Sequence, residues 1–257
     1  MGLTFERYCA VIVERSQRLR SEIAGADLSR LVVTCPDWTL NGLVRHLGGG
    51  QGWAEEIVRT RAGAPPSDEH FRDLSRYTGE DPVKLGDWLV EGAIELADAL
   101  RAAGPDASMW TPVAGGTAAF YARRFAHETV IHGADATVTL GNEFAVADDV
   151  AADGLDEWLE LAALPEMLDY HPGWRELFGP GRTVALRATG APLSWLIDFT
   201  GETLGWRRDA PDGATVTVSA PLSDLLLIVY GRREPVVADV DGDAQLLDSV
   251  LSRMSFG

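Results

Sequence analysis

The sequence predicts a two-domain protein with an all-helical first half and a second half of mixed strands and helices. The chain has 257 residues, a length at which proteins commonly divide into two domains. Amphipathic segments of bundle length fill the chain as far as residue 140, and short β-prone runs appear only after residue 180. We place the boundary between domains 1–145 and 146–257.

Segments of the first half repeat apolar residues with the spacing of amphipathic helices. Thr4 and Thr39 can cap the first two helices, and Gly104 with Pro105 ends the third. The Pro-rich stretch 62–81 is expected to be a long loop. The predicted helices are 5–23, 40–61, 82–103 and 117–140. Helices of this length and number predict a four-helix bundle, in which inward-facing side chains converge on the core.

The second half is predicted to be an α+β domain. A loop over 28–39 belongs to the first domain, and a linker over 141–150 joins the two. A helix over 151–168 follows, and then the β-prone runs TVALRAT, SWLIDFT and TVTVSA. The helical run SDLLLIVYGRR, the predicted strand PVVADVD and a helix over 244–254 complete the chain.

Composition limits the partners and the compartment. The formal charge of −17 argues against binding to nucleic acid or to an anionic membrane surface. The longest apolar run, 225–230, is too short to span a bilayer, and the start of the chain lacks a signal-peptide pattern, so we expect a cytoplasmic protein. Cys9 and Cys35 cannot form a Cys-rich zinc cluster. Any metal site must therefore use histidine and carboxylate. Nearly all positive charge is arginine, which fits a GC-rich genome.

The stretch YARRFAHETVIHGAD, residues 121–135, contains the clearest chemical pattern. Glu128 and His132 stand four residues apart on a predicted helix, so their side chains point the same way, one turn apart. On spacing alone, such a pair is more often an exposed ion pair than a metal site. The apolar residues around it indicate a buried helix, where polar side chains need partners. His127 suggests the HExxH signature of zinc proteases, but the second histidine comes five residues later, on another face.

A third ligand must come from elsewhere, and His46 in the second predicted helix is the best candidate. Helices of a bundle bring their inward residues together, so His46 can meet Glu128 and His132. Three protein ligands leave a tetrahedral position open for water or a substrate atom, as in catalytic zinc sites. Trp53 lies two turns after His46 on the same face, and Asp135 could accept a hydrogen bond from His132.

A run of glycines follows His46, at positions 48–50 and 52. Each glycine costs a helix ~1 kcal/mol relative to alanine. Such a run either permits close helix packing, leaves room for a ligand, or kinks the helix. The sequence does not choose among these three.

Several of these stretches together resemble one known family. CPDWTLNGLVRHLG, RRFAHETVIHGADA, and DLLLIVYGRR followed by VDGDAQLLDSVL are similar to the mycothiol-dependent maleylpyruvate isomerase family of actinobacteria. The resemblance covers nearly the whole chain. It implies a DinB-type four-helix domain that carries zinc on two histidines and a glutamate, matching His46, Glu128 and His132.

The same resemblance implies a smaller α+β domain, similar to sterol-carrier folds, that contributes a catalytic arginine. Arg232 is the matching residue, with Arg233 as the alternative. A helix C-terminus also favours cations, so a structural role for this pair is equally compatible with the sequence. Trp53 is expected to line the cofactor-binding part of the site.

The implied function is a zinc- and mycothiol-dependent isomerase or S-transferase. A zinc ion with an open position lowers the pKa of a small thiol, so that the thiolate dominates at neutral pH. That thiolate can add to the double bond of a cis-enedioate such as maleylpyruvate, and its elimination after rotation gives the trans isomer. If the thiol is not eliminated and the adduct is the product, the enzyme is an S-transferase. An arginine would pair with the substrate carboxylate.

Two other functions fit the same residues. A zinc hydrolase would hold an activated water and need a general base, for which Asp135 and Asp37 are the local candidates. A non-catalytic stress or sensor protein would bind metal or thiol without turnover. Nickel or iron would also fit the donors. The expected partners are a small electrophile and a low-molecular-weight thiol, and the sequence is compatible with a monomer.

Overall fold

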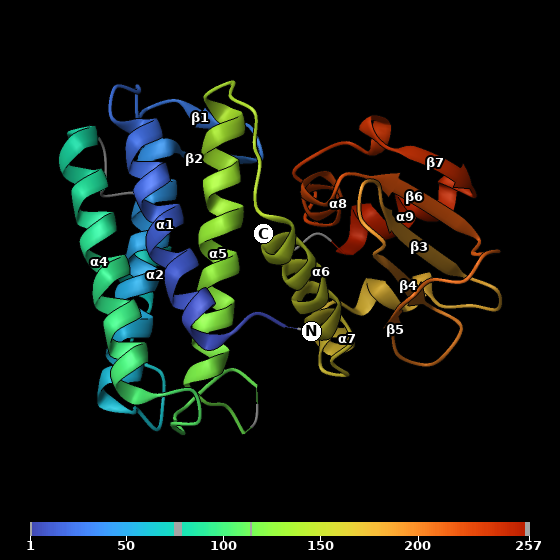
Figure 1. The fold of residues 1–257 in the computed structure, drawn as a ribbon, viewed down its shortest axis with the longest axis horizontal. Coiled ribbons are helices and arrows are strands. Elements are labelled where there is room, and N and C mark those ends of the chain that lie inside the picture. The colour runs from blue at the N-terminus through green and yellow to red at the C-terminus, as the bar shows by residue number, and fades with distance from the viewer. Residues whose placement is uncertain (1, 75–78, 114, 255–257) are drawn as a thin grey trace. The chain divides into compact units, whose positions relative to one another are not determined.

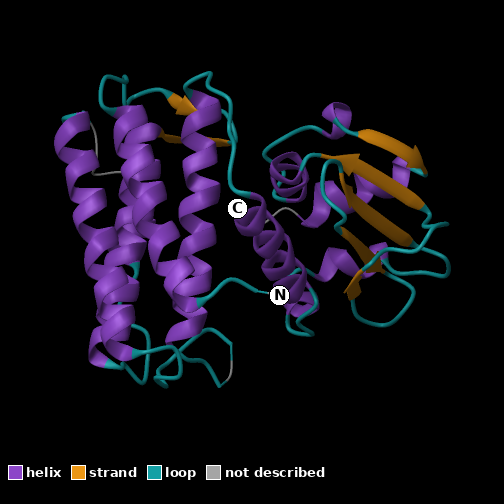
Figure 2. Ribbon diagram, in the orientation of Figure 1, coloured by secondary structure: helices purple, strands orange, loops and turns teal. Residues whose placement is uncertain are grey.

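The computed structural model describes residues 2–74, 79–113 and 115–254. The chain divides into two compact units, Met1–Phe144 and Ala145–Gly257. Unit 1 is helical and unit 2 contains a β-sheet, which confirms the predicted fold class (Figures 1 and 2).

Unit 1 is a bundle of long helices. Helix α1 packs against α4 and α5, and α2 packs against the same two helices (Figure 1). All four lie where the sequence predicts them, within one residue at each end. The elements of unit 1 are α1 (Phe5–Ile23), β1 (Leu31–Val32), β2 (Cys35–Thr39), α2 (Leu40–Thr60), α3 (Glu69–Arg72), α4 (Pro82–Ala103) and α5 (Ala118–Thr139).

The helix ends follow the capping signals of the sequence. The Thr4 hydroxyl accepts a hydrogen bond from the Arg7 amide at 3.2 Å, and Thr39 accepts one from the Gly42 amide at 3.1 Å. Such caps stabilise a helix by ~1 kcal/mol each. Because Thr39 fixes the start of α2, it also fixes the register of His46, two turns later.

Two predicted loops of unit 1 contain regular structure. Residues 28–39 form an antiparallel hairpin of β1 and β2, and the stretch 62–81 contains the short helix α3. The hairpin is fastened to α5 by side chains. The Val33 amide donates to the Thr139 hydroxyl at 3.1 Å, and the Thr34 hydroxyl donates to Asp135 at 2.6 Å. These contacts are tertiary, so the local periodicity of the sequence does not predict them.

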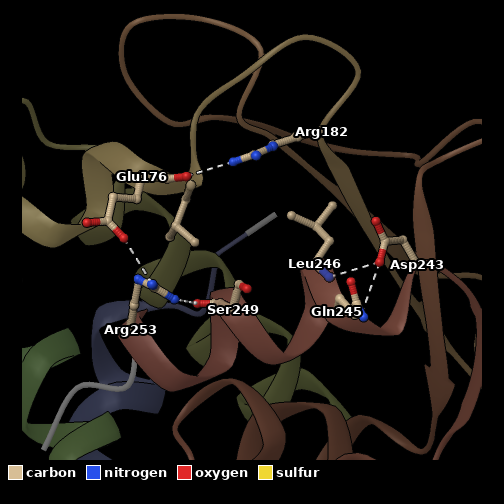
Figure 3. Close-up of a pocket in the computed structure, with 8 residues that line it drawn as sticks. Glu176, Arg182, Asp243, Gln245, Leu246, Ser249 and Arg253 are labelled. Carbon is tan, nitrogen blue, oxygen red and sulfur yellow. Dashed lines mark hydrogen bonds and ion pairs between the residues drawn. The ribbon is translucent and has the colours of Figure 1, made fainter.

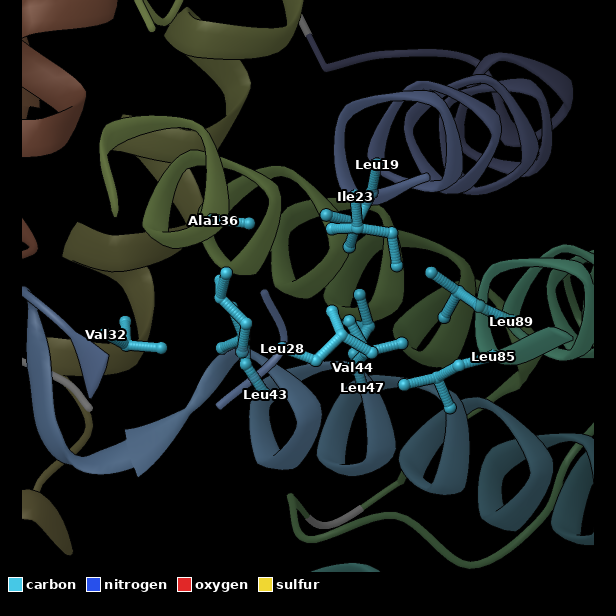
Figure 4. Packing of buried hydrophobic residues seen from close by; sticks show 11 residues of the cluster. Leu19, Ile23, Leu28, Val32, Leu43, Val44, Leu47, Leu85, Leu89 and Ala136 are labelled. Atoms are coloured by element: carbon cyan, nitrogen blue, oxygen red, sulfur yellow. The ribbon is translucent and has the colours of Figure 1, made fainter. Parts of the chain in front are cut away.

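The core of the bundle is apolar at the level of the hairpin and the first turns of α2. Every long helix of the bundle contributes to it, so that burial holds α2 and α5 side by side (Figure 4). The buried cluster consists of Leu19, Ile23, Leu28, Val32, Leu40, Leu43, Val44, Leu47, Leu85, Leu89 and Ala136. Each fully buried leucine contributes roughly 1.5–3 kcal/mol.

Unit 2 is built around a mixed sheet with strand order β5-β4-β3-β6-β7. β3 and β6 run parallel, and the other neighbouring strands run antiparallel. Helix α8 packs on β3 and β6, and α6 packs on α8. The elements are α6 (Asp148–Ala162), α7 (Met167–Tyr170), η1 (Pro172–Leu177), β3 (Thr183–Ala188), β4 (Ser194–Asp198), β5 (Gly205–Arg208), β6 (Val216–Ala220), α8 (Leu222–Val229), η2 (Pro235–Val237), β7 (Asp239–Gly242) and α9 (Ala244–Met254).

The sequence predicted unit 2 less accurately than unit 1. The predicted helix 151–168 begins earlier, at Asp148 within the expected linker, and ends at Ala162, before Pro165. β5 was not predicted, because four residues are too few to show an alternating pattern. The predicted strand over PVVADVD is partly wrong, since its first residues form the 3-10 turn η2.

No helix within the described ranges is long and apolar enough to cross a bilayer.

Candidate functional site

The predicted ligands of unit 1 lie next to one another on two adjacent helices. Glu128 and His132 are one turn apart on α5, with 3.2 Å between Glu128 Oε2 and His132 Nε2. His46 comes from α2, and its ring centroid lies 5.2 Å from that of His132 at an interplanar angle of 83°. The arrangement thus brings two imidazoles and a carboxylate from separate helices into one place.

The surroundings of His46 define its protonation state. Nδ1 of His46 lies 3.0 Å from the carbonyl oxygen of Phe71. A carbonyl oxygen only accepts, so Nδ1 carries the proton. Burial lowers the pKa of His46 to about 4, an effect that the nearby His132 reinforces. At neutral pH the ring is therefore neutral, and Nε2 is left with an unshared electron pair.

Polar side chains form a continuous row along α5. Arg124 Nε donates to Glu128 Oε1 at 3.2 Å, and the other oxygen of Glu128 faces His132. His132 Nδ1 lies 3.0 Å from Asp135 Oδ2, as predicted for an orienting acceptor. Asp135 is fully buried, and its second oxygen accepts from the Thr34 hydroxyl. Both nitrogens of His132 therefore face carboxylates.

This row shifts the pKa values of its members. Burial by itself would lower the pKa of His132, but the hydrogen bonds that its ring donates to Asp135 and Glu128 outweigh burial and raise the pKa to about 9. Burial would likewise raise the pKa of Glu128, but the Arg124 and His132 charges outweigh it and lower that pKa. At neutral pH this raised pKa favours the imidazolium form of His132, which lies between two carboxylates.

The arrangement has not assembled a metal centre. Among the residues that the structure describes, no group of three or more His, Cys, Asp or Glu side chains is placed to hold a metal ion. The Glu128 carboxylate is instead hydrogen-bonded to Arg124 and paired with His132. The chemistry of the donor set nevertheless fits a divalent cation, because each imidazole has its Nδ1 tied to an acceptor, the usual orientation of metal-binding histidines.

His127 lies apart from this group, as its spacing predicts. It is buried against Tyr8 of α1, with 6.2 Å between the ring centroids. The zinc-protease interpretation of the HExxH-like stretch is therefore wrong.

Aromatic rings surround His46. Trp38, at the end of β2, lies 4.6 Å from the His46 ring centroid, and Phe71 of α3 lies 5.7 Å from it. Sequence analysis did not identify these two residues or Arg124 as part of the site. The position of Trp38 next to the capping residue Thr39 was the available clue, but the direction of its side chain depends on the β1–β2 hairpin, which the sequence did not predict.

Trp53 has a structural attachment. Its indole Nε1 donates to the Pro66 carbonyl oxygen at 3.0 Å, and its ring meets those of Phe71, Trp110 and Tyr121 edge-on at 5.8 to 6.2 Å. Trp53 thus fastens the segment after α2 to the bundle. Its predicted role in cofactor binding stays a prediction.

The glycines after His46 allow close packing. A Cβ at Gly48 would lie 2.4 Å from the Trp88 ring of α4, and one at Gly49 would lie 2.4 Å from Phe71 Cβ. A Cβ at Gly50 would lie 3.3 Å from the Phe125 ring of α5. The helix runs without interruption through all of them, and three of the four glycines lie where another side chain approaches α2 closely.

The two candidate arginines of unit 2 differ in their contacts. Arg233 forms an ion pair with Asp224 in the first turn of α8. Arg232 is buried, and its guanidinium donates to the Tyr230 carbonyl oxygen at 2.8 Å. Arg232 remains the predicted catalytic arginine.

Unit 2 also has a polar surface pocket of about 270 Å³ (Figure 3). Arg182 donates to the Glu176 carbonyl oxygen at 2.6 Å, and Arg253 donates to the Glu176 carboxylate at 3.0 Å. Both arginines thus donate to Glu176, Arg253 as an ion pair and Arg182 to the backbone, and the pocket lining does not include the predicted site residues. The lining consists of Glu176, Leu177, Arg182, Asp243, Gln245, Leu246, Ser249 and Arg253.

The fold and the α2–α5 site define a class of protein: a helical bundle with a polar His, Glu and His group, followed by an α+β domain. Residues 9–137 match the family described as Mycothiol maleylpyruvate isomerase N-terminal domain, and residues 149–249 match the MDMPI C-terminal domain. The chain therefore belongs to the mycothiol-dependent maleylpyruvate isomerase family, as the sequence resemblance predicted.

Solved structures agree with this assignment. The crystal structure of the mycothiol-dependent maleylpyruvate isomerase is 16% identical, with a TM-score of 0.63, and the match covers 94% of this chain and 95% of that one. A histidine-to-alanine mutant of the mycothiol-dependent maleylpyruvate isomerase is 17% identical, with a TM-score of 0.62 and the same coverage. At these identities the likeness shows the fold.

A third structure, UbiJ-SCP2 Ubiquinone synthesis protein, covers 43% of this chain and 93% of its own at a TM-score of 0.31. That likeness is too slight to test the predicted sterol-carrier resemblance. Comparison with curated proteins finds no match.

Proposed function

We propose that this protein is a metal- and thiol-dependent enzyme that isomerises, or transfers a thiol to, a small electrophile of the maleylpyruvate type. His46, Glu128 and His132 would hold the cation, with zinc preferred for two imidazoles and a carboxylate. The observation that supports this most is the tethering of Nδ1 in both histidines, His46 to the Phe71 carbonyl and His132 to Asp135. Membership of an enzyme family supports it independently.

The two histidines differ in the protonation change that binding of a cation would require. His46 is neutral and its Nε2 is unprotonated, so it can bind a cation without first losing a proton. His132 must first lose the proton that it shares with Glu128. Binding would therefore replace the hydrogen bond between these two residues and release a proton.

The chain's own residues account for the rest of the site. When bound, a divalent cation lowers the pKa of a thiol, so that the thiolate of a cosubstrate such as mycothiol prevails at neutral pH. Trp38 and Phe71 place apolar rings beside His46, which would limit the access of water to a sulfur bound there. Arg124, one turn before Glu128, provides positive charge at the edge of the site.

The proposed reaction is an addition followed by an elimination. The thiolate adds to one alkene carbon of a cis-enedioate, and the electron pair moves to the adjacent carbonyl. The former double bond then rotates, and expulsion of the thiolate restores the alkene in the trans form. Arg232 is the proposed partner of a substrate carboxylate, for which a planar guanidinium is well suited. If the adduct is protonated instead, the product is a thioether.

The contacts of the carboxylates argue against a hydrolase. Asp135 is fully buried and hydrogen-bonded to Thr34 and to His132, so it is not available to deprotonate a water. Asp37 is exposed on the hairpin. Because one local candidate for a general base is already engaged and the other faces solvent, these contacts support the thiol-dependent reaction over metal-assisted hydrolysis.

The test combines metal analysis with turnover. The purified protein is expected to bind about one zinc per chain and to convert maleylpyruvate only when mycothiol is present. His46→Gln should abolish both properties, whereas His171→Gln, in unit 2, should preserve them. Hydrolysis of esters or amides without thiol, or metal binding without any thiol-dependent turnover, would contradict the proposal.

A further inference from the structure

The segment after α2 is fastened to that helix at three separate points. At its start, Trp53 Nε1 donates to the Pro66 carbonyl oxygen at 3.0 Å. In its middle, the buried side chain of Phe71 packs on α2. At its end, Glu80 is ion-paired with Arg45 and accepts from Asn41 at 3.0 Å.

The middle attachment depends on the missing side chain of Gly49. A Cβ at position 49 would lie 2.4 Å from Phe71 Cβ and 3.5 Å from Phe71 Cα. Real Cβ atoms essentially never approach another atom that closely, and the obstacle is the root of a side chain rather than its flexible end. An alanine at this position must therefore displace the backbone of residue 71.

The displaced backbone carries the carbonyl group that His46 contacts. The Phe71 carbonyl oxygen accepts from His46 Nδ1 at 3.0 Å, and the two rings lie edge-on at 5.7 Å. Gly49 is about one turn after His46 on α2, so the space left by the missing Gly49 side chain, here called the glycine notch, lies next to the imidazole on one helix face. The glycine thus determines how closely the segment approaches the histidine.

We propose that Gly49 and Phe71 are positioning residues for His46: the glycine notch seats Phe71, whose carbonyl oxygen keeps the proton on Nδ1 and leaves Nε2 free for a ligand. This explains why the helix tolerates a glycine that costs it ~1 kcal/mol. It also couples the segment after α2 to the candidate metal site. The inference rests on the proposed function for the identity of the ligand, but its geometry concerns the metal-free protein.

The experiment compares Gly49→Ala with Gly52→Ala. Gly52 is on the same helix, and a Cβ there meets nothing within 4 Å, which makes it a matched control. In metal-free protein, ¹⁵N–¹H correlation of the ring nitrogens reports the tautomer of His46, whose signals are assigned by their loss in His46→Gln. We expect the Nδ1–H tautomer in the native chain and in Gly52→Ala, and a mixture of tautomers in Gly49→Ala.

Zinc titration by calorimetry provides the second measurement. Loss of an orienting partner typically weakens metal binding by about 10- to 100-fold, so we expect that weakening in Gly49→Ala and none in Gly52→Ala. If Gly49→Ala does not fold, Phe71→Ala replaces it. That variant keeps the carbonyl group and the Cβ atom but removes the buried ring whose packing holds residue 71 against α2, and it should show the same mixture of tautomers.

The outcomes separate this inference from the proposed function. A native chain that binds no zinc overturns the proposed function, while the tautomer measurement still decides the role of Gly49. If His46 keeps its Nδ1 proton in Gly49→Ala, or in Phe71→Ala where that variant replaces it, the positioning role is wrong. It is equally wrong if Gly52→Ala changes the ring as much as Gly49→Ala does.

Discussion

Replacing Asp135 by asparagine should lower both the pKa of His132 and the stability of the metal-free protein. The carboxylate is fully buried and lies 3.0 Å from His132 Nδ1. Asparagine keeps the shape but removes the charge that favours the imidazolium. The pKa of His132, now about 9, should fall toward its ordinary value of 6.5 or below, because burial then acts with less opposition.

The size and the pH range of the effect follow from linkage. A group whose pKa is raised in the folded state stabilises the fold fully below its unfolded pKa, and this contribution is lost as the pH rises through the folded pKa. For His132 the loss runs from pH 6.5 to about 9. At ~1.4 kcal/mol per pH unit, the whole contribution is ~3 kcal/mol. The difference in unfolding free energy between native protein and Asp135→Asn should approach that value below pH 6.5 and shrink toward pH 9.

Urea denaturation of metal-free protein at a series of pH values measures this difference, and NMR titration of the His132 ring measures the pKa directly. Asp27→Asn is the matched control, because Asp27 is an exposed carboxylate that accepts from Ser29 at 2.6 Å. It makes the same change in net charge at an exposed position whose carboxylate has no contact with His132 among those described. The reasoning is refuted if the His132 pKa does not move, or if the stability difference stays constant across this range.

Two further predictions concern packing and thiol reactivity. Gly48→Ala should destabilise unit 1. Overpacking against Trp88 costs roughly 1–3 kcal/mol, which outweighs the ~1 kcal/mol gained in helix propensity. A urea midpoint at or above that of the native protein would contradict this prediction. Cys9 is fully buried, and burial raises the pKa of its thiol to about 11. Iodoacetamide at pH 8 should therefore label Cys35 well before Cys9, which peptide mass spectrometry can measure. Equal rates of labelling at the two cysteines would contradict this expectation.

Local sequence signals predicted the parts of the fold that local physics determines. The caps at Thr4 and Thr39 and the stop at Gly104 gave the helix ends of unit 1, because each acts within one turn. The β1–β2 hairpin could not be predicted in this way. Its strands are short, and it is held by the hydrogen bonds of Val33 and Thr34 to α5, more than 100 residues away.

In the candidate site, too, the contacts within one helix could be predicted and the contacts between distant segments could not. The i, i+4 spacing predicted that Glu128 and His132 share a face, because helix geometry alone fixes it. The orienting contact of Asp135 could be inferred for the same reason. The Phe71 carbonyl beside His46 could not, because a backbone atom has no sequence signature and its position depends on a glycine three residues after the histidine.

The two histidines show why spacing could not decide between an ion pair and a metal site. Burial keeps His46 neutral, while two carboxylates keep His132 charged, so neighbouring groups of one type have pKa values of about 4 and about 9. Opposed values of this kind are a common feature of functional sites. Glu128 belongs to both interpretations, because the carboxylate that pairs with His132 in the metal-free chain is also the one that the proposed cation would bind. Spacing places Glu128 beside His132 in either case, so it is the proton on His132, and not the spacing, that distinguishes an ion pair from a ligand pair.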